Sequence, residues 1–170
     1  MSELTDFRKT KDTFFKEDHQ SPLDSREKKD FSGLHYYPEN PDLRFDLALE
    51  KVPEPEQVSL PTSTGDQQEY WHVGQIRFSV QGRAAILQVY LAVEGGEYFI
   101  PFVDATAPTE TYAAGRYLEP EDLGDVRLRV DFNLAYNPYC AYNDNWSCPI
   151  PPRANRLVVR IEAGEKKYHD

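Results

Sequence analysis

The chain has 170 residues, of which 39% are hydrophobic, 13% aromatic and 28% charged, a composition typical of one globular domain. Its 19 basic and 29 acidic residues give a formal net charge of −10, which argues against nucleic acid and anionic lipid as partners. The apolar runs are a few residues long, whereas about 20 are needed to cross a bilayer, and the N-terminus lacks a signal-peptide core. We therefore expect a single acidic, cytoplasmic domain spanning 1–170, with neither nucleic acid nor a membrane as partner.

The first 33 residues are predicted to form two short helices. In the first, over 4–18, apolar positions recur at helical spacing: Leu4, Phe7, Lys11 by its stem, and Phe14 or Phe15. Ser21 suits an N-cap and Pro22 the first helical position, which predicts a second helix over 22–30. Gly33 would end it. We expect the apolar side of the first helix, with Leu4, Phe7 and Phe14, to dock on a sheet formed later in the chain.

Beyond residue 33 the apolar period changes from helical to two, which is typical of half-buried strands. Pro53, Pro55 and Pro61 predict a loop, because proline cannot donate to a central ladder, and Gly95-Gly96 between β-rich runs predicts a hairpin. The expected strands are 43–49, 76–80, 83–93, 98–103, 126–132 and 157–161. The sequence thus predicts a mainly β chain, on the border of α+β. Its form would be an antiparallel β-sandwich or partly open barrel over 34–170, with the helical segment 1–33 packed on it.

Residues 131–156 form a stretch of about two dozen residues without a regular period. It is rich in tyrosine, proline and asparagine, and Pro138 opposes a helix through Tyr136, Tyr139 and Tyr142. A long loop in a compact domain is usually functional or disordered, and the aromatic content argues against disorder. Two interpretations stay open: a loop packed on its own tyrosines, and the wall of a binding site.

Several clusters resemble an uncharacterised prokaryotic family, the domain of unknown function 1684. They include Phe31-Ser32-Gly33-Leu34, Pro101-Phe102-Val103-Asp104-Ala105-Thr106, Gly115-Arg116-Tyr117-Leu118, Ala135-Tyr136-Asn137-Pro138, Cys140-Ala141-Tyr142, Cys148-Pro149, Asn155-Arg156-Leu157 and Ala163-Gly164-Glu165-Lys166. The matching clusters extend over most of the chain. The resemblance implies no activity. Where family members commonly carry Gly-Gly before Gly-Arg-Tyr, this chain has Ala113-Ala114.

Asp131 is the first candidate site residue, because it is an acid placed among Val130, Phe132 and nearby tyrosines. A buried carboxylate needs a partner, so we expect Asp131 to pair with an arginine, Arg116 first and Arg156 second. Such a pair would either anchor the long loop or clamp a ligand, because a guanidinium fork suits a carboxylate.

The two cysteines, Cys140 and Cys148, allow three interpretations: ordinary reduced thiols, a disulfide closing a loop of about nine residues, or a nucleophile at Cys140 with His35 or His72 as base. As zinc ligands they are weak candidates, since no histidine stands at a ligand spacing. The sequence carries no nucleotide-binding, zinc-protease or hydrolase motif, and it leaves any cofactor unidentified.

The favoured function is a small-molecule-binding domain, either a plain binder or an enzyme, with a pocket built from segments 104–117 and 131–156. The alternative is a structural or protein-interaction module that uses the 131–156 loop. Candidate catalytic residues are Cys140 and Asp131. Candidate ligand-binding residues are Asp104, Arg116, Asp131, Asn133, Tyr136, Asn137, Tyr142, Asn155 and Arg156.

Overall fold

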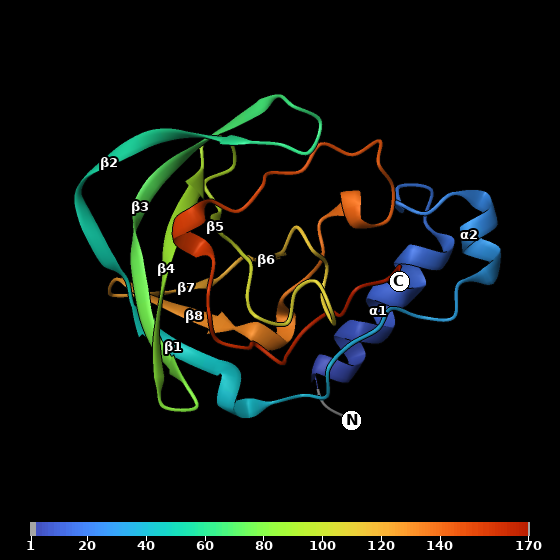
Figure 1. Ribbon diagram of the computed structural model, residues 1–170, viewed down its shortest axis with the longest axis horizontal. Helices are drawn as coiled ribbons and strands as arrows, with labels where there is room; N and C mark the ends of the chain where they lie inside the picture. The colour runs from blue at the N-terminus through green and yellow to red at the C-terminus, as the bar shows by residue number, and fades with distance from the viewer. Residues whose placement is uncertain (1–2, 170) are drawn as a thin grey trace.

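The computed structural model describes residues 3–169 and has a mainly β architecture, as predicted (Figure 1). A five-stranded antiparallel sheet has the order β2-β3-β4-β5-β6, and a three-stranded one has the order β1-β8-β7. The two sheets form a sandwich-like arrangement and not a closed barrel. The strands are β1 (Arg44–Ala48), β2 (Glu50–Pro61), β3 (Gln67–Val80), β4 (Arg83–Ala92), β5 (Tyr98–Phe102), β6 (Arg116–Leu118), β7 (Glu121–Gly124) and β8 (Arg127–Asp131).

The helical elements are few. They are α1 (Glu3–Glu17), α2 (Ser25–Asp30) and the 3-10 helices η1 (Pro41–Leu43), η2 (Phe132–Leu134), η3 (Tyr139–Ala141) and η4 (Arg153–Asn155). Within residues 3–169 no helix has the length and apolar character needed to span a membrane.

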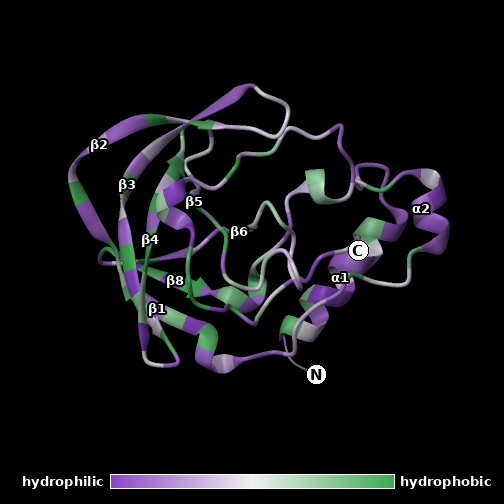
Figure 2. Ribbon diagram, viewed as in Figure 1, coloured by the Kyte–Doolittle hydropathy of each residue, from purple (hydrophilic) through white to green (hydrophobic). Residues whose placement is uncertain are grey.

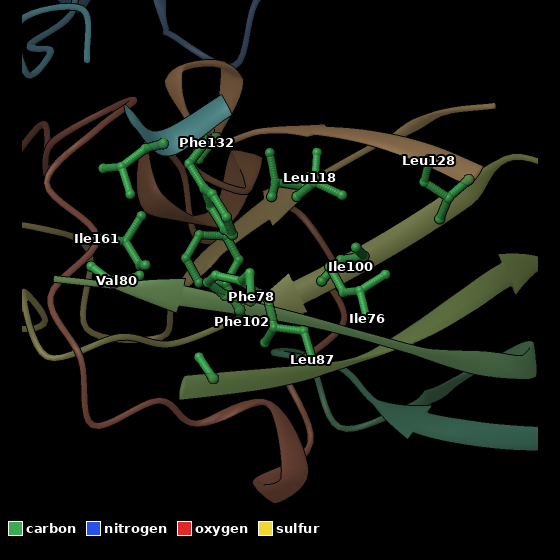
Figure 3. Close-up of a cluster of buried hydrophobic side chains, with 14 of the residues drawn as sticks. Ile76, Phe78, Val80, Leu87, Ile100, Phe102, Leu118, Leu128, Phe132 and Ile161 are labelled. Atoms are coloured by element: carbon green, nitrogen blue, oxygen red, sulfur yellow. The ribbon is translucent and has the colours of Figure 1, made fainter. Parts of the chain in front are cut away.

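The main core lies between the sheets and centres on Phe132 (Figure 3). Its ring contacts Phe78 from the large sheet, Phe45 from the small sheet and Phe102 from β5, with centroids 5.2, 6.1 and 5.6 Å away. Alternate residues of β1, β3, β4, β5 and β8 reach this space because side chains alternate along a strand. Ile76, Leu87, Ile100, Leu128 and Val130 fill it.

The prediction of a loop around residues 53–61 is wrong, because these residues belong to β2. The strand tolerates its prolines because it lies at the edge of the large sheet, where one side of its backbone has no partner strand. Its pairing with β3 also shifts register between Lys51 and Glu56, around Pro53 and Pro55. The strand is largely hydrophilic along its length (Figure 2), so it lacks the apolar alternation that would have indicated a strand.

The expected strand over 157–161 is also wrong. Val159 and Ile161 are buried, as their alternation predicted, but the segment is an irregular chain held by single hydrogen bonds. The Ala105 amide donates to the Val159 carbonyl at 2.9 Å, and the Ile161 amide donates to Asp104 Oδ2 at 2.6 Å. The apolar pattern identified burial correctly, whereas the pairing of the backbone depended on the neighbouring segments.

The two N-terminal helices are present, with a different cap for the second. Asp24, not Ser21, is the N-cap of α2, and it accepts a hydrogen bond from the Glu27 amide at 2.8 Å in a capping box. Ser21 instead donates to the Phe15 carbonyl at 2.7 Å. The Ser21 hydroxyl thereby holds the turn between the two helices.

Helix α1 docks on the 131–156 loop and not on a sheet, which corrects the expected docking of Leu4, Phe7 and Phe14. Phe15 is 1% exposed, and its ring meets Tyr139 and Tyr142 edge-on at 6.2 and 5.0 Å. Phe7 is 49% exposed. In Figure 1 the loop lies between the sheets and α1. The helix therefore covers the most aromatic segment of the chain.

We predict that Phe15→Ala lowers the free energy of unfolding by about 3–5 kcal/mol, because it opens a cavity between α1 and the loop. Phe7→Ala, on the same helix, should cost about 1 kcal/mol or less, since surface substitutions have small effects. Chemical denaturation of both variants measures the difference. Equal stabilities would show that α1 does not dock through Phe15.

Candidate functional site

Arg116 and Asp104 form a buried ion pair at the centre of the molecule. Arg116 Nη2 donates to Asp104 Oδ1 at 3.2 Å, and the two side chains are 1% and 2% exposed. The guanidinium also donates to three carbonyls of the C-terminal segment, those of Ile161, Ala163 and Glu165. Burial lowers the pKa of Arg116, and the Asp104 carboxylate opposes that shift. A guanidinium used in this way holds the C-terminal segment and does not face a ligand.

Two local features position this pair. Asp104 also accepts hydrogen bonds from the hydroxyl of Thr106 at 2.9 Å and the amide of Ile161 at 2.6 Å. Gly115, just before the arginine, has φ +100°, and a Cβ there would lie 2.4 Å from the Phe102 carbonyl oxygen. Only glycine fits this close approach, which lets β6 carry Arg116 into the interior.

The predicted pair between Asp131 and Arg116 is therefore wrong: the acid beside Arg116 is Asp104. Asp131 is half-buried at the end of β8 and accepts hydrogen bonds from the Asn133 amide and side chain at 3.0 and 2.9 Å. Asn133 in turn exchanges two hydrogen bonds with the backbone of Asn40. Both residues thus fasten the chain before β1 to the turn after β8.

A second buried charge, Glu165, connects the C-terminal segment to the loop and to α1. Its carboxylate accepts hydrogen bonds from the Asn137 amide at 3.0 Å, the Tyr142 hydroxyl at 2.9 Å and the ammonium of Lys11. Asn137 also donates to the Lys166 carbonyl at 3.0 Å. The candidate ligand residues Asn137 and Tyr142 therefore both donate to this buried carboxylate, while the side-chain oxygen of Asn137 is buried without a hydrogen-bond partner among the described residues.

Asn155 and Arg156 differ in their exposure to solvent. Asn155 is fully buried: its side chain donates to the carbonyls of Gln88 and Pro101 and accepts from the Gln88 amide at 2.7 Å. The side-chain amide of Asn155 thus hydrogen-bonds to the backbone of β4 and β5 in the way that a peptide group of a neighbouring strand would. Arg156 is exposed.

The main candidate site is a groove of about 880 Å³ between α1 and the 131–156 loop. We name it the aromatic groove. Most of its lining is apolar, and it is formed by Phe7, Thr10, Lys11, Phe14, Phe15, Gln68, Tyr117, Glu119, Leu134, Tyr136, Pro138, Tyr139, Trp146, Ser147, Cys148 and Pro149. A smaller hollow of about 220 Å³ continues past Tyr117 and Tyr136 towards Tyr70 and Phe99.

Lys11, Tyr136 and Glu119 place polar groups next to one another in the aromatic groove. Lys11 Nζ lies 5.0 Å from the centroid of the Tyr136 ring while it pairs with Glu165. The Tyr136 hydroxyl donates to Glu119, and burial together with this carboxylate raises the pKa of Tyr136. The groove thus has apolar walls with an ammonium, a phenol and a carboxylate at one side.

A second cleft of about 740 Å³ lies beside the small sheet and contains Asp131 and Asn133. Its charged lining is mainly acidic, with Arg44 and Arg129 as the cations. Arg129 already forms a two-armed contact with Asp46 at 2.9 and 3.2 Å. Ligand sites are usually apolar with a few converging polar groups, so the aromatic groove is the better candidate.

The candidate nucleophile, Cys140, is half-buried next to Cys148, and both thiols are free. The expected bases, His35 and His72, contact other groups: His35 stacks on Tyr168, and His72 Nε2 lies 2.8 Å from Gln88 Oε1. Residues 3–169 contain no cluster of three or more His, Cys, Asp or Glu side chains suited to a metal ion.

The pocket predicted from 104–117 and 131–156 differs from the aromatic groove in one wall. The loop contributes Tyr136 and its neighbours, but the first segment contributes Tyr117 alone, and α1 supplies the opposite side. The residues missed were Lys11 and Glu119. The apolar spacing of α1, which includes Lys11, is the sequence signal that could have identified this wall, but the spacing alone indicates only that this side of the helix docks on another part of the chain.

A family model described as "Protein of unknown function (DUF1684)" matches residues 29–166. Among solved structures, the chain is similar to the solution NMR structure of an uncharacterized protein from gene locus rrnAC0354 of Haloarcula marismortui. The two are 40% identical with a TM-score of 0.72, over 96% of this chain and 91% of the other. A comparison with curated proteins finds no match.

We predict that Asp104→Asn destabilises the protein by about 3–5 kcal/mol, because it leaves the Arg116 charge buried without its counter-ion. Asp131→Asn is the matched control. An asparagine oxygen can still accept the Asn133 amide hydrogen bond, so the cost should be about 1 kcal/mol or less. Denaturant unfolding compares the two, and a larger loss for Asp131→Asn would restore the pairing expected from the sequence.

Proposed function

This chain belongs to the DUF1684 family of proteins of unknown function, and we propose that it is a small-molecule-binding domain whose site is the aromatic groove. The observation that gives this proposal the most support is the combination of about 880 Å³ of space, aromatic walls and the polar side chains of Lys11, Tyr136 and Glu119 at one side. Ligand sites in proteins commonly enclose about 300–1,000 Å³ and share this division of apolar walls and few polar groups.

The walls favour a ligand with a flat, apolar body. Phe14, Tyr139 and Trp146 line the groove, and aromatic rings pack well edge-on or offset against other rings. Tyr139 and Trp146 already pack edge-on, with centroids 4.9 Å apart. An aromatic or alicyclic ring system fits such a surface better than a flexible, charged molecule.

The polar side favours a hydrogen-bond acceptor on that ligand. Within the described chain Lys11 donates one hydrogen bond, to Glu165, whereas an ammonium carries three N–H groups. The carboxylate of Glu165 balances the charge of Lys11, so the groove does not require an anion. A carbonyl, hydroxyl or sulfonate oxygen of the ligand, placed near Tyr136, would accept hydrogen bonds from the N–H groups of Lys11 that do not bond to Glu165.

The proposal is one of binding and not of catalysis. The two candidate catalytic residues, Asp131 and Cys140, are not among the residues that line the aromatic groove. Asp131 caps the turn after β8. The groups that do face the groove are suited to positioning a ligand.

One observation favours the alternative, a protein-interaction module. Phe7, Leu134 and Trp146 are 49%, 41% and 39% exposed and all border the groove. Exposed apolar side chains that gather on one surface often mark an interface. The hollow between them favours a small molecule, and the experiment below separates the two.

The test uses 1-anilinonaphthalene-8-sulfonate, a fluorescent probe with an aromatic body and a sulfonate acceptor. We predict saturable binding to the folded protein, and about tenfold weaker binding to Trp146→Ala, which equals about 1.4 kcal/mol. Trp71→Ala is the matched control: Trp71 is 36% exposed on β3 and does not line the groove. Fluorescence titration measures both dissociation constants.

A second pair of variants blocks the groove without removing a wall. Thr10 and Thr13 are both exposed on α1 and donate to the carbonyl four residues earlier, but Thr10 alone lines the groove. Thr10→Trp should abolish probe binding, and Thr13→Trp should leave it unchanged. Equal binding by both variants, or by both tryptophan-to-alanine variants, would refute the groove as the site.

A further inference from the structure

Cys140 and Cys148 lie against one another, although seven residues separate them in the loop. The Cys140 amide donates a hydrogen bond to Cys148 Sγ, with an N–S distance of 3.3 Å. Because a cysteine's own Sγ is three bonds from its backbone nitrogen, both sulfurs surround the same amide. The two sulfurs are thus close to the same backbone nitrogen.

The surroundings hold the two cysteines in place. The Cys148 amide donates to the Ser63 hydroxyl at 3.1 Å, and the Ser63 amide donates to the Cys148 carbonyl at 3.0 Å. This fixes Cys148 to the turn after β2. The Tyr112 hydroxyl lies 3.8 Å from Cys140 Sγ. The position of Cys148 beside Cys140 is therefore maintained by two segments remote in sequence from the loop.

The two thiols are not equivalent. Cys140 is half-buried, whereas Cys148 is buried. The hydrogen bond from the Cys148 thiol lowers the pKa of Cys140 to about 6, with help from Tyr112 and Ser63 and against the effect of burial. The same contact raises the pKa of Cys148. The more accessible sulfur is thus the one that carries the thiolate, which is the nucleophilic form.

We propose that Cys140 and Cys148 form a thiol–disulfide exchange site for low-molecular-weight disulfides, with Cys140 as the attacking and Cys148 as the resolving cysteine. This inference does not rest on the proposed function of the aromatic groove.

The exchange proceeds in two balanced steps. The Cys140 thiolate attacks one sulfur of the disulfide RSSR, forms a Cys140–SR mixed disulfide and releases RS⁻. Cys148 then loses its proton to the released thiolate and attacks Cys140 Sγ, which expels the second RS⁻. The two protein thiols are oxidised by two electrons, and RSSR is reduced to two thiols. The product is a Cys140–Cys148 disulfide.

The test treats the full-length protein with oxidised glutathione, followed by acid quenching, alkylation and intact-mass measurement. The wild-type protein should lose both free thiols without retaining glutathione. Cys148→Ser should accumulate an adduct with one glutathione on Cys140, because the resolving thiol is absent. Cys140→Ser should react at least about tenfold more slowly, since Cys148 is buried and protonated. Near-ultraviolet circular dichroism checks that each variant is folded.

A second measurement needs no variant. Brief alkylation of the reduced wild-type protein with iodoacetamide, followed by peptide mapping, should label Cys140 at least about tenfold faster than Cys148 at neutral pH. The rate at Cys140 should fall as the pH drops through about 6. Equal labelling of the two cysteines, or an intramolecular disulfide that fails to form with oxidised glutathione, would overturn the proposal.

Discussion

The Arg116 guanidinium lies inside the molecule and holds the C-terminal segment against β6. It pairs with Asp104 and donates to the carbonyls of Ile161, Ala163 and Glu165. A buried charge is costly unless it is paired and hydrogen-bonded. This requirement fixes where residues 161–165 run, although they form no regular strand. The core residues Val159 and Ile161, and the buried Glu165, depend on that path.

Glu165 links the C-terminal segment to the long loop and to α1. Its amide donates to the Ala135 carbonyl at 2.9 Å, and its carboxylate accepts from Asn137, Tyr142 and Lys11. The long loop and α1 therefore meet at one buried carboxylate, and Arg116 of β6 donates to the backbone carbonyl of the same residue. The aromatic groove exists because α1 is held at this point while its apolar side chains face the loop's tyrosines. Its shape is a consequence of charge pairing as much as of apolar packing.

The proposed binding site and the proposed exchange site use different residues of the same loop and share Cys148. Tyr136, Tyr139 and Trp146 face the aromatic groove, whereas Cys140 lies among Tyr112 and Ser63. Cys148 belongs to both, since it lines the groove and contacts Cys140. Such a loop is ordered by burial of its aromatic side chains and by contacts with distant segments, so it needs no regular secondary structure of its own.

The sequence by itself determined the mainly β architecture, the two N-terminal helices and the irregular, aromatic character of the 131–156 loop, because periodicity and aromatic content are local properties. Val159 and Ile161 were correctly expected to be buried. Only the tertiary structure decided that Asp104 and not Asp131 faces Arg116, that β2 runs through its prolines at a sheet edge, and that Lys11 reaches Glu165. Each of these depends on which segments become neighbours in space. An acid, a proline or a lysine does not encode its distant partner, because charge and hydrogen-bonding capacity are the same for every candidate until the backbone brings one of them within reach.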